Sequence, residues 1–246
     1  MPGIEFAYKL IMYKGIYIAL SGAILKQKHM DVHAQNVANA NTSGYKKDRL
    51  SFKDYLIPVD NSNPLVSDGR SMTELSNSTT DFSSGVLNKT GNPLDIAING
   101  GGFFALEGNR YTRNGSFKID GEGYLVTLND IKVLGSGGPI SLNGSNVAVT
   151  SSGEIIVDNS PVDILQIVDF PDKSVLSKMD GSVFTAVEQG ETVNSDISQG
   201  YLETSNVDAV REMVEMLTSQ REFEAYQKII RLFDDASSRT INEMGK

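Results

Sequence analysis

The feature that most constrains the fold is a long helical pattern near the C-terminal end of the chain. No Gly or Pro occurs between Val207 and Met244, and apolar residues recur at helical spacing. Ser205 is predicted to be the N-cap, with Asp208 completing a shortened capping box, and Gly245 is predicted to end the helix. At about 1.5 Å per residue, this helix would be roughly 55 Å long. Its apolar stripe therefore needs a partner helix, in this chain or in another one.

The apolar stripe of this helix falls into two sets, each with 3-4-3 spacing, and its phase is predicted to shift near Gln220. A shift of phase moves the stripe around the helix, so the two sets would face different directions unless the helix adjusts. The two sets, in chain order, are Val207, Val210, Val214 and Leu217, then Phe223, Tyr226, Ile230 and Phe233.

The beginning of the chain supplies a second long helix. Its stripe has the 4-3 spacing of a coiled-coil heptad, and small residues together with a Gln favour close, specific packing. Heptads alone would equally permit an antiparallel helix pair that packs on an ordinary core. The stripe consists of Ile16, Leu20, Ala23, Gln27, Met30, Ala34 and Val37.

Composition limits the classes of function. The 246 residues are 39% hydrophobic and 22% charged, which is enough for a hydrophobic core in one to three domains. A net charge of −9 disfavours binding to nucleic acid. The chain contains no cysteine, which excludes disulfides, thiolate catalysis and Cys-ligated metals.

The N-terminal residues do not have the pattern of a signal peptide, because Lys9 and Lys14 interrupt the apolar run. No window of about 18 apolar residues predicts a membrane span. The heptad pattern begins only at Ile16, so Met12 is expected to be the native start and Met1–Ile11 an upstream extension. The intact mass of the native protein tests this expectation, since a mass that includes those residues contradicts it.

The predicted fold class is α+β, with a coiled-coil-like pair of terminal helices and a central all-β domain. Residues 1–45 and 205–246 are predicted to be the helical segments, and 81–191 the β domain. Short strands separated by frequent turn residues favour a small open barrel or a folded sheet. A stretch with Pro, Gly and many Ser, Asn and Thr predicts an extended connector at 46–80. Its counterpart is expected at 192–204, which leads back into the last helix.

The first helix ends in a motif rich in Asn that contains a Thr and a Gly. Gly44 is predicted to have the positive φ of a C-terminal turn. The residues expected to fix this helix exit are Asn36, Asn39, Thr42, Gly44 and Tyr45.

The sequence predicts no catalytic, cofactor or metal site. His29 and His33 are four residues apart and could share a helix face, but no third metal ligand is evident. The glycines at 100–102 are not followed by the Lys and Ser/Thr of a phosphate loop, so a tight hairpin is expected there. Asp120 and Glu122 lie in a predicted turn, where solvent exposure is expected.

Several motifs resemble one known family. The run Asn-Val-Ala-Asn-Ala-Asn-Thr-Ser-Gly-Tyr-Lys at 36–46 resembles the signature of the bacterial flagellar rod, hook and hook-associated proteins. Residues 16–22 resemble the opening of the same family, and residues 94–135 resemble its central segment. Residues 200–208 and 212–217 resemble its C-terminal part. The motifs occur in the order that the family has.

This resemblance implies a structural subunit of the flagellar basal-body rod, which is neither an enzyme nor a cofactor-binding protein. It implies a periplasmic rod and export by the flagellar export apparatus without a cleaved signal peptide. The implied partners are copies of this chain and neighbouring rod subunits, with no nucleic acid, small-molecule substrate or membrane span. Features at 221–224, Lys228 and 234–235 favour the proximal-rod subunit over the distal-rod subunit. A secreted coiled-coil adhesin and a carbohydrate-acting enzyme are the alternatives from other classes.

For a rod subunit, the functional residues are those of the interface between helices. The predicted seam consists of Ile16, Leu20, Ala23, Met30, Ala34 and Val37 on the first helix, and Val210, Val214, Leu217, Phe223, Tyr226, Ile230 and Phe233 on the second.

Overall fold

The computed structural model describes residues 2–58, 67–144 and 146–244, with side chains described at 15–51, 78–144, 146–236 and 238–239. Gly245, the predicted helix stop, lies outside the described residues. Contacts divide the chain into two units. The helical unit comprises Met1–Val37, Asp48–Thr79 and Asp208–Lys246, and the β unit comprises Ala38–Lys47 and Thr80–Val207. The fold class is α+β, as predicted.

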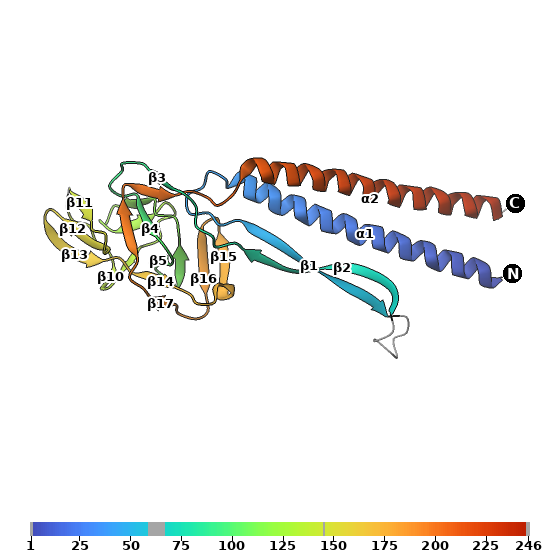
Figure 1. Ribbon diagram of the computed structural model, residues 1–246, viewed down its shortest axis with the longest axis horizontal. Coiled ribbons are helices and arrows are strands. Elements are labelled where there is room, and N and C mark those ends of the chain that lie inside the picture. Colours follow the sequence, from blue (N-terminus) through green and yellow to red (C-terminus); the bar gives the residue numbers. More distant parts are fainter. Residues whose placement is uncertain (1, 59–66, 145, 245–246) are drawn as a thin grey trace. The chain divides into compact units, whose positions relative to one another are not determined.

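Two long helices dominate the helical unit. They are α1 (Pro2–Ala38) and α2 (Ala209–Met244), drawn in blue and red in Figure 1, and they lie side by side. Contacts of Gly15 with Phe233 and of His33 with Glu212 show that the two helices are antiparallel. Among the described helices, neither is long and apolar enough to cross a membrane.

The start of α2 corrects the predicted cap. The helix begins at Ala209, and Asp208 Oδ1 accepts hydrogen bonds from the N–H groups of Val210 and Arg211, both at 3.1 Å. These are the unpaired donors that an N-cap side chain satisfies, so Asp208 is the N-cap. Ser205 lies before the helix, where its Oγ accepts a hydrogen bond from Val207 N–H at 3.2 Å.

Both segments predicted to be connectors contain strands. In the first, β1 (Asp48–Pro58) and β2 (Ser67–Thr80) pair with each other in the helical unit. In the second, β18 (Asp196–Gln199) and β19 (Tyr201–Glu203) belong to the β unit, as does β17 (Glu191–Thr192) at its start. β1 and β2 are neighbours in the sequence, whereas β18 and β19 pair with residues 96–99 and 87–89, far away along the chain, which local composition does not reveal.

The largest sheet of the β unit has six antiparallel strands in the order β15-β16-β6-β5-β14-β17. Smaller antiparallel sheets pair β18 with β4, β19 with β3, β7 with β8 and β10 with β9, and join β11, β12 and β13. None of the sheets in the described part of the chain closes into a barrel. A 3-10 turn, η1 (Lys173–Val175), precedes β15. The other strands of the β unit are β3 (Leu87–Lys89), β4 (Ile96–Asn99), β5 (Phe103–Leu106), β6 (Arg110–Thr112), β7 (Phe117–Ile119), β8 (Leu125–Thr127), β9 (Leu134–Gly135), β10 (Gly138–Pro139), β11 (Val147–Val149), β12 (Glu154–Val157), β13 (Ser160–Ile164), β14 (Ile167–Asp169), β15 (Leu176–Asp180) and β16 (Val183–Ala186).

Strand β5 separates two hydrophobic clusters and explains why its sequence is entirely apolar. Phe104 and Leu106 belong to one cluster, and Phe103 and Ala105 belong to the other. Alternate side chains of a strand point to opposite faces of the sheet, so both faces of β5 are buried. The second cluster is rich in aromatic rings, and the rings of Phe103 and Phe184 are 5.8 Å apart in an edge-to-face arrangement.

Candidate functional site

The face of α1 that contacts α2 carries small and polar residues. A Cβ added at Gly22 would lie 2.6 Å from the ring of Tyr226, so the absence of a side chain at this position allows the ring to pack there. Gly15 lies against the ring of Phe233 in the same way, with a corresponding distance of 3.0 Å. Lys26 Nζ forms an ion pair of 2.6 Å with a carboxylate oxygen of Glu222.

These contacts lie one residue before the predicted seam of α1. The contacting residues include Gly15, Gly22, Lys26 and His33, which have a heptad-like spacing of their own. Of the predicted seam residues, Ala23 is buried, and Leu20 and Ala34 are exposed. The half-buried members of the predicted seam are Ile16, Met30 and Val37.

The covered face of α2 follows one phase along its length, without the predicted shift near Gln220. Each residue on it is buried or half-buried, and the spacing is 4-3 throughout. Three residues of the predicted seam, Val210, Val214 and Leu217, instead lie on an exposed face, where their exposed fractions are 73%, 57% and 51%. The covered residues are Glu212, Met216, Ser219, Phe223, Tyr226, Ile230 and Phe233.

Glu212 is buried on the covered face because residues of α1 satisfy its carboxylate. His33 Nδ1 lies 2.6 Å from Glu212 Oε2, and Asn36 Nδ2 donates to the same oxygen at 3.2 Å. Asn36 also exchanges two hydrogen bonds with the backbone of Asp48, at 3.0 and 3.1 Å. This buried Asn therefore joins the end of α1 to both α2 and β1 in the helical unit.

Two histidines lie on α1 near this contact. The rings of His29 and His33 stack with centroids 5.9 Å apart. Within the side chains that the structure describes, no three His, Asp or Glu residues are grouped to hold a metal ion. Burial lowers the pKa of His29, and the nearby charge of Lys26 lowers the pKa further, as does His33 when it is protonated.

The lowered pKa of His29 predicts that acid weakens the helix pair. Between the pKa of His29 in the folded chain and its unfolded value near 6.5, the unfolded chain binds more protons, so stability falls as the pH drops through this range. His29→Gln should therefore reduce the loss of thermal stability of the helices between about pH 7 and pH 5. Thermal unfolding followed by helical circular dichroism measures the difference, and an equal loss in wild type and variant contradicts the prediction.

Residues 39–45 of the helix-exit motif fold as a turn inside the β unit, whereas Asn36 lies on α1 in the helical unit. The N–H of Thr42 donates to the carbonyl of Asn39 at 3.1 Å, and the Thr42 hydroxyl donates to Asn39 Oδ1 at 3.2 Å. Gly44 has a φ of +68°, which confirms the predicted positive φ. Its N–H donates to the carbonyl of Glu203 at 2.8 Å. Tyr45 is fully buried, and Lys178 Nζ lies 4.2 Å from the centre of its ring.

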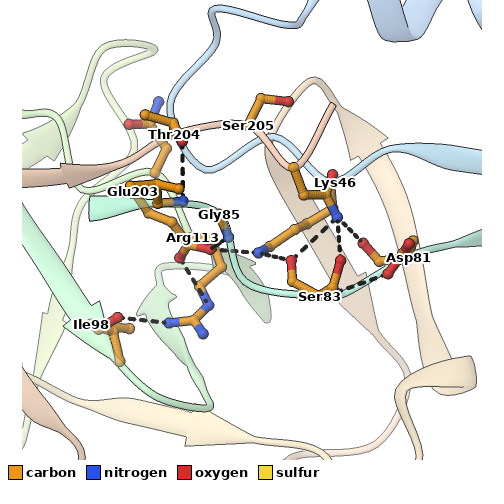
Figure 2. Close-up of polar contacts among 12 residues, drawn as sticks. Lys46, Asp81, Ser83, Gly85, Ile98, Arg113, Glu203, Thr204 and Ser205 are labelled. Carbon is orange, nitrogen blue, oxygen red and sulfur yellow. Dashed lines mark hydrogen bonds and ion pairs between the residues drawn. The ribbon is translucent and has the colours of Figure 1, made fainter. Parts of the chain in front are cut away.

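Next to this turn lies a buried ion cluster, defined here as Lys46, Arg113 and Glu203 (Figure 2). Lys46 Nζ is 2.6 Å from Glu203 Oε1, and the two side chains are 1% and 2% exposed. Lys46 Nζ also donates to the carbonyl of Ser83 at 2.7 Å, and Gly85 N–H donates to Glu203 Oε1 at 2.8 Å. Both ends of the ion pair are thus bound to backbone groups.

Arg113 approaches the second carboxylate oxygen of Glu203, with 3.6 Å between Nε and Oε2. Its guanidinium also donates to the carbonyls of Ile98, at 3.4 Å, and of Gly100. Burial lowers the pKa of both Lys46 and Arg113, and the negative charge of Glu203 opposes this effect. The carboxylate of Glu203 therefore lies between two buried cations.

Sequence reasoning did not select the three residues of the ion cluster. Lys46 ends the helix-exit motif, Arg113 lies in the central segment, and Glu203 lies in the motif that precedes α2. Three of the stretches that carry the family resemblance, 36–46, 94–135 and 200–208, thus each contribute one charged residue to a single buried site. The available signal was a charged residue within each motif, but nothing in the sequence showed that the three would meet.

Three family models match successive parts of the chain. "Flagella basal body rod protein" matches residues 16–46, "Flagellar hook protein FlgE/F/G D1 domain" matches 97–157, and "Flagellar basal body rod FlgEFG protein C-terminal" matches 198–243. Each of these three matches includes one residue of the ion cluster.

Full-length relatives match as well. The chain is 31% identical to the flagellar basal-body rod protein FlgF of Caulobacter vibrioides, over 96% of this chain and 99% of that protein. It is 31% identical to the flagellar basal-body rod protein FlgG of Bacillus subtilis, over 94% of this chain and 99% of that protein. The FlgF protein of Escherichia coli is 30% identical, with 93% and 97% covered.

The chain belongs to the flagellar basal-body rod protein family. It is a structural subunit of the flagellar rod.

Proposed function

We propose that the chain is a proximal-rod subunit, and that its terminal helices pack with those of other subunits into the axial shaft that transmits torque from motor to hook. The observation that carries this proposal is the exposed apolar face of each helix. On α1, Tyr17 and Ile24 are exposed, and on α2, Val210, Val214 and Leu217 are exposed. Burying a side chain of this kind contributes roughly 1.5–3 kcal/mol, so neighbouring helices would be stabilised by covering these faces.

The interaction of α1 with α2 is proposed to be coiled-coil-like. The 4-3 spacing of the covered residues on α2 supports it, since this spacing keeps a seam on one side of a helix. The remaining exposed stripes would then contact neighbouring subunits, which extends the assembly through head-to-tail contacts.

The position within the rod is part of the same proposal. Relatives named FlgF and relatives named FlgG match this chain at 31% identity each, so identity does not separate the two kinds. The features at 221–224, Lys228 and 234–235 favour the proximal rod, and the distal rod is the second candidate. Family membership likewise supports a periplasmic location and export by the flagellar apparatus without a cleaved signal peptide.

Epitope labelling in purified basal bodies tests the proposal. A strain that lacks the gene is expected to be non-motile and to form incomplete rods, and the tagged gene should restore both. Electron microscopy of gold-labelled tags should place the label on the part of the rod nearest the motor. A label nearer the hook would support the distal rod, and a motile strain without the gene would contradict a rod function.

The same strains discriminate between the rod and the two other classes. A secreted adhesin would be found at the cell surface or in the medium, with complete rods in its absence. If the chain were a carbohydrate-acting enzyme, the purified protein would hydrolyse carbohydrate. The rod proposal expects the tagged chain to copurify with basal bodies and expects neither of these results.

A further inference from the structure

The buried ion cluster is not accounted for by the exposed helix faces, since all its members lie in the β unit. Taking an ion out of water is costly, and it is tolerated only where geometry and hydrogen bonds compensate. Among the described side chains of low exposure, no buried polar atom lacks a hydrogen-bond partner. Ion pairs and hydrogen bonds therefore compensate for the burial of these three charged side chains.

The hydrogen bonds of the cluster require each donor to face its acceptor, so they depend on the register of β19. Glu203 Oε1 accepts both from Lys46 Nζ and from Gly85 N–H, while Lys46 Nζ also donates to a carbonyl. A shift of β19 by one residue would turn Glu203 to the other face of its strand and bring Leu202 or Thr204 to this position. Neither of those side chains could satisfy two buried cations, so only one register satisfies the cluster.

Hydrogen bonds around the cluster join the segment that leaves α1 to the segment that leads into α2. Besides the bond from Gly44 to Glu203, Asn206 N–H donates to the carbonyl of Tyr45 at 3.4 Å. Asn206 Oδ1 accepts from Lys47 N–H at 2.8 Å, and Asn206 Nδ2 donates to the carbonyl of Asp81 at 2.8 Å. The segments 44–47 and 203–206 are thus bound together within the β unit.

We propose that Lys46, Arg113 and Glu203 act as a positioning lock, which fixes the register of residues 38–47 against β19. The segment that leaves α1 and the segment that leads into α2 are then held in one folded body before a neighbouring subunit binds. This body comprises residues 38–47 and 80–207, and is larger than the β domain of 81–191 predicted from the sequence.

Hydrogen exchange on the full-length free subunit tests the lock without depending on the proposed position in the rod. In the wild type, the amides of Gly44, Lys47, Gly85 and Asn206 should be protected to a degree similar to that of Ala105 in β5. Exchange of these four amides at the rate of an unstructured peptide would overturn the proposal.

Lys46→Met supplies the sharper test, because it leaves Glu203 buried without its ammonium partner. Breaking a buried ion pair on one side is expected to accelerate exchange at the four amides by about 100-fold or more. Exchange at Ala105 should change by less than about tenfold, since local opening does not require the central strands to separate. An equal acceleration at all five amides would show general destabilisation and would overturn the lock.

The matched control is Lys118→Met, the same substitution at an exposed ion pair of the same unit. Lys118 Nζ is 2.8 Å from Asp130, and the side chains are 43% and 72% exposed. Exposed pairs contribute little, so exchange at the four amides should be unchanged. The same pattern in Lys118→Met and Lys46→Met would contradict the proposal. If Lys46→Met does not fold, Glu203→Gln replaces it, because this variant keeps an acceptor for Gly85 N–H. It should likewise accelerate exchange at the four amides more than at Ala105, and an equal acceleration at all five amides would overturn the lock.

Discussion

Gly44→Ala is expected to destabilise the β unit by roughly 2–5 kcal/mol. Gly44 has a φ of +68°, and the left-handed conformation costs a residue with a Cβ about 1–2 kcal/mol. The added Cβ would also lie 2.3 Å from the backbone nitrogen of Asn114 and 2.4 Å from the carbonyl carbon of Arg113. Backbone cannot move aside as a flexible side chain can, and overpacking of this kind costs about 1–3 kcal/mol more.

Urea unfolding of the full-length chain, followed by the aromatic signal of the β unit, measures this loss. Gly121→Ala is the control, because Gly121 lies in an exposed turn where a Cβ would meet no atom within 4 Å. That variant should unfold within about 0.5 kcal/mol of the wild type. A Gly44→Ala subunit as stable as the Gly121→Ala subunit would contradict the close packing described for the helix exit.

Leu217→Asp is expected to abolish rod assembly while the subunit remains folded. Leu217 is 51% exposed on α2, so the substitution removes little of the packing within the chain. In an interface between subunits, the same change would remove the burial of an apolar side chain, worth roughly 1.5–3 kcal/mol, and would bury a carboxylate as well. A loss of about 3 kcal/mol at each contact weakens that contact by about 100-fold, and the loss recurs at every subunit.

Motility and electron microscopy of basal bodies measure the assembly, and circular dichroism of the purified variant measures the folding. The matched control is Leu128→Asp, the same substitution at a residue of the β unit that is 60% exposed. We expect Leu128→Asp to support rods and Leu217→Asp to support none. Normal rods in the Leu217→Asp strain would show that the exposed face of α2 is not part of the assembly interface.

The two long helices, the short strands between them and the conformation of Gly44 could be predicted from the sequence. Each of these depends on local properties. Absence of Gly and Pro permits the second long helix, and the spacing of apolar residues indicated the first. Frequent turn residues separate short strands, and a residue without a Cβ adopts positive φ at little cost. The family resemblance likewise rested on contiguous motifs, and it led to the rod family that the comparisons show.

Which faces of the helices are covered depends instead on contacts between distant parts of the chain. The prediction followed large apolar residues, and it therefore assigned Val210, Val214 and Leu217 to the seam. The covered positions of α2 include Glu212 and Ser219, because His33 and Asn36 of α1 satisfy the Glu212 carboxylate there. Apolar periodicity cannot reveal a face of this kind, since the polar residues on it are stabilised by partners from elsewhere in the chain.

The ion cluster could not be predicted from the sequence for the same reason. Lys46, Arg113 and Glu203 look like ordinary surface residues in the sequence, because charged side chains are almost never fully buried unless they are paired. Whether they are paired depends on contacts between residues such as Lys46 and Glu203, which are far apart along the chain. Local preference shaped the elements of this subunit, whereas contacts between distant charges join the segment that leaves α1 to the segment that leads into α2.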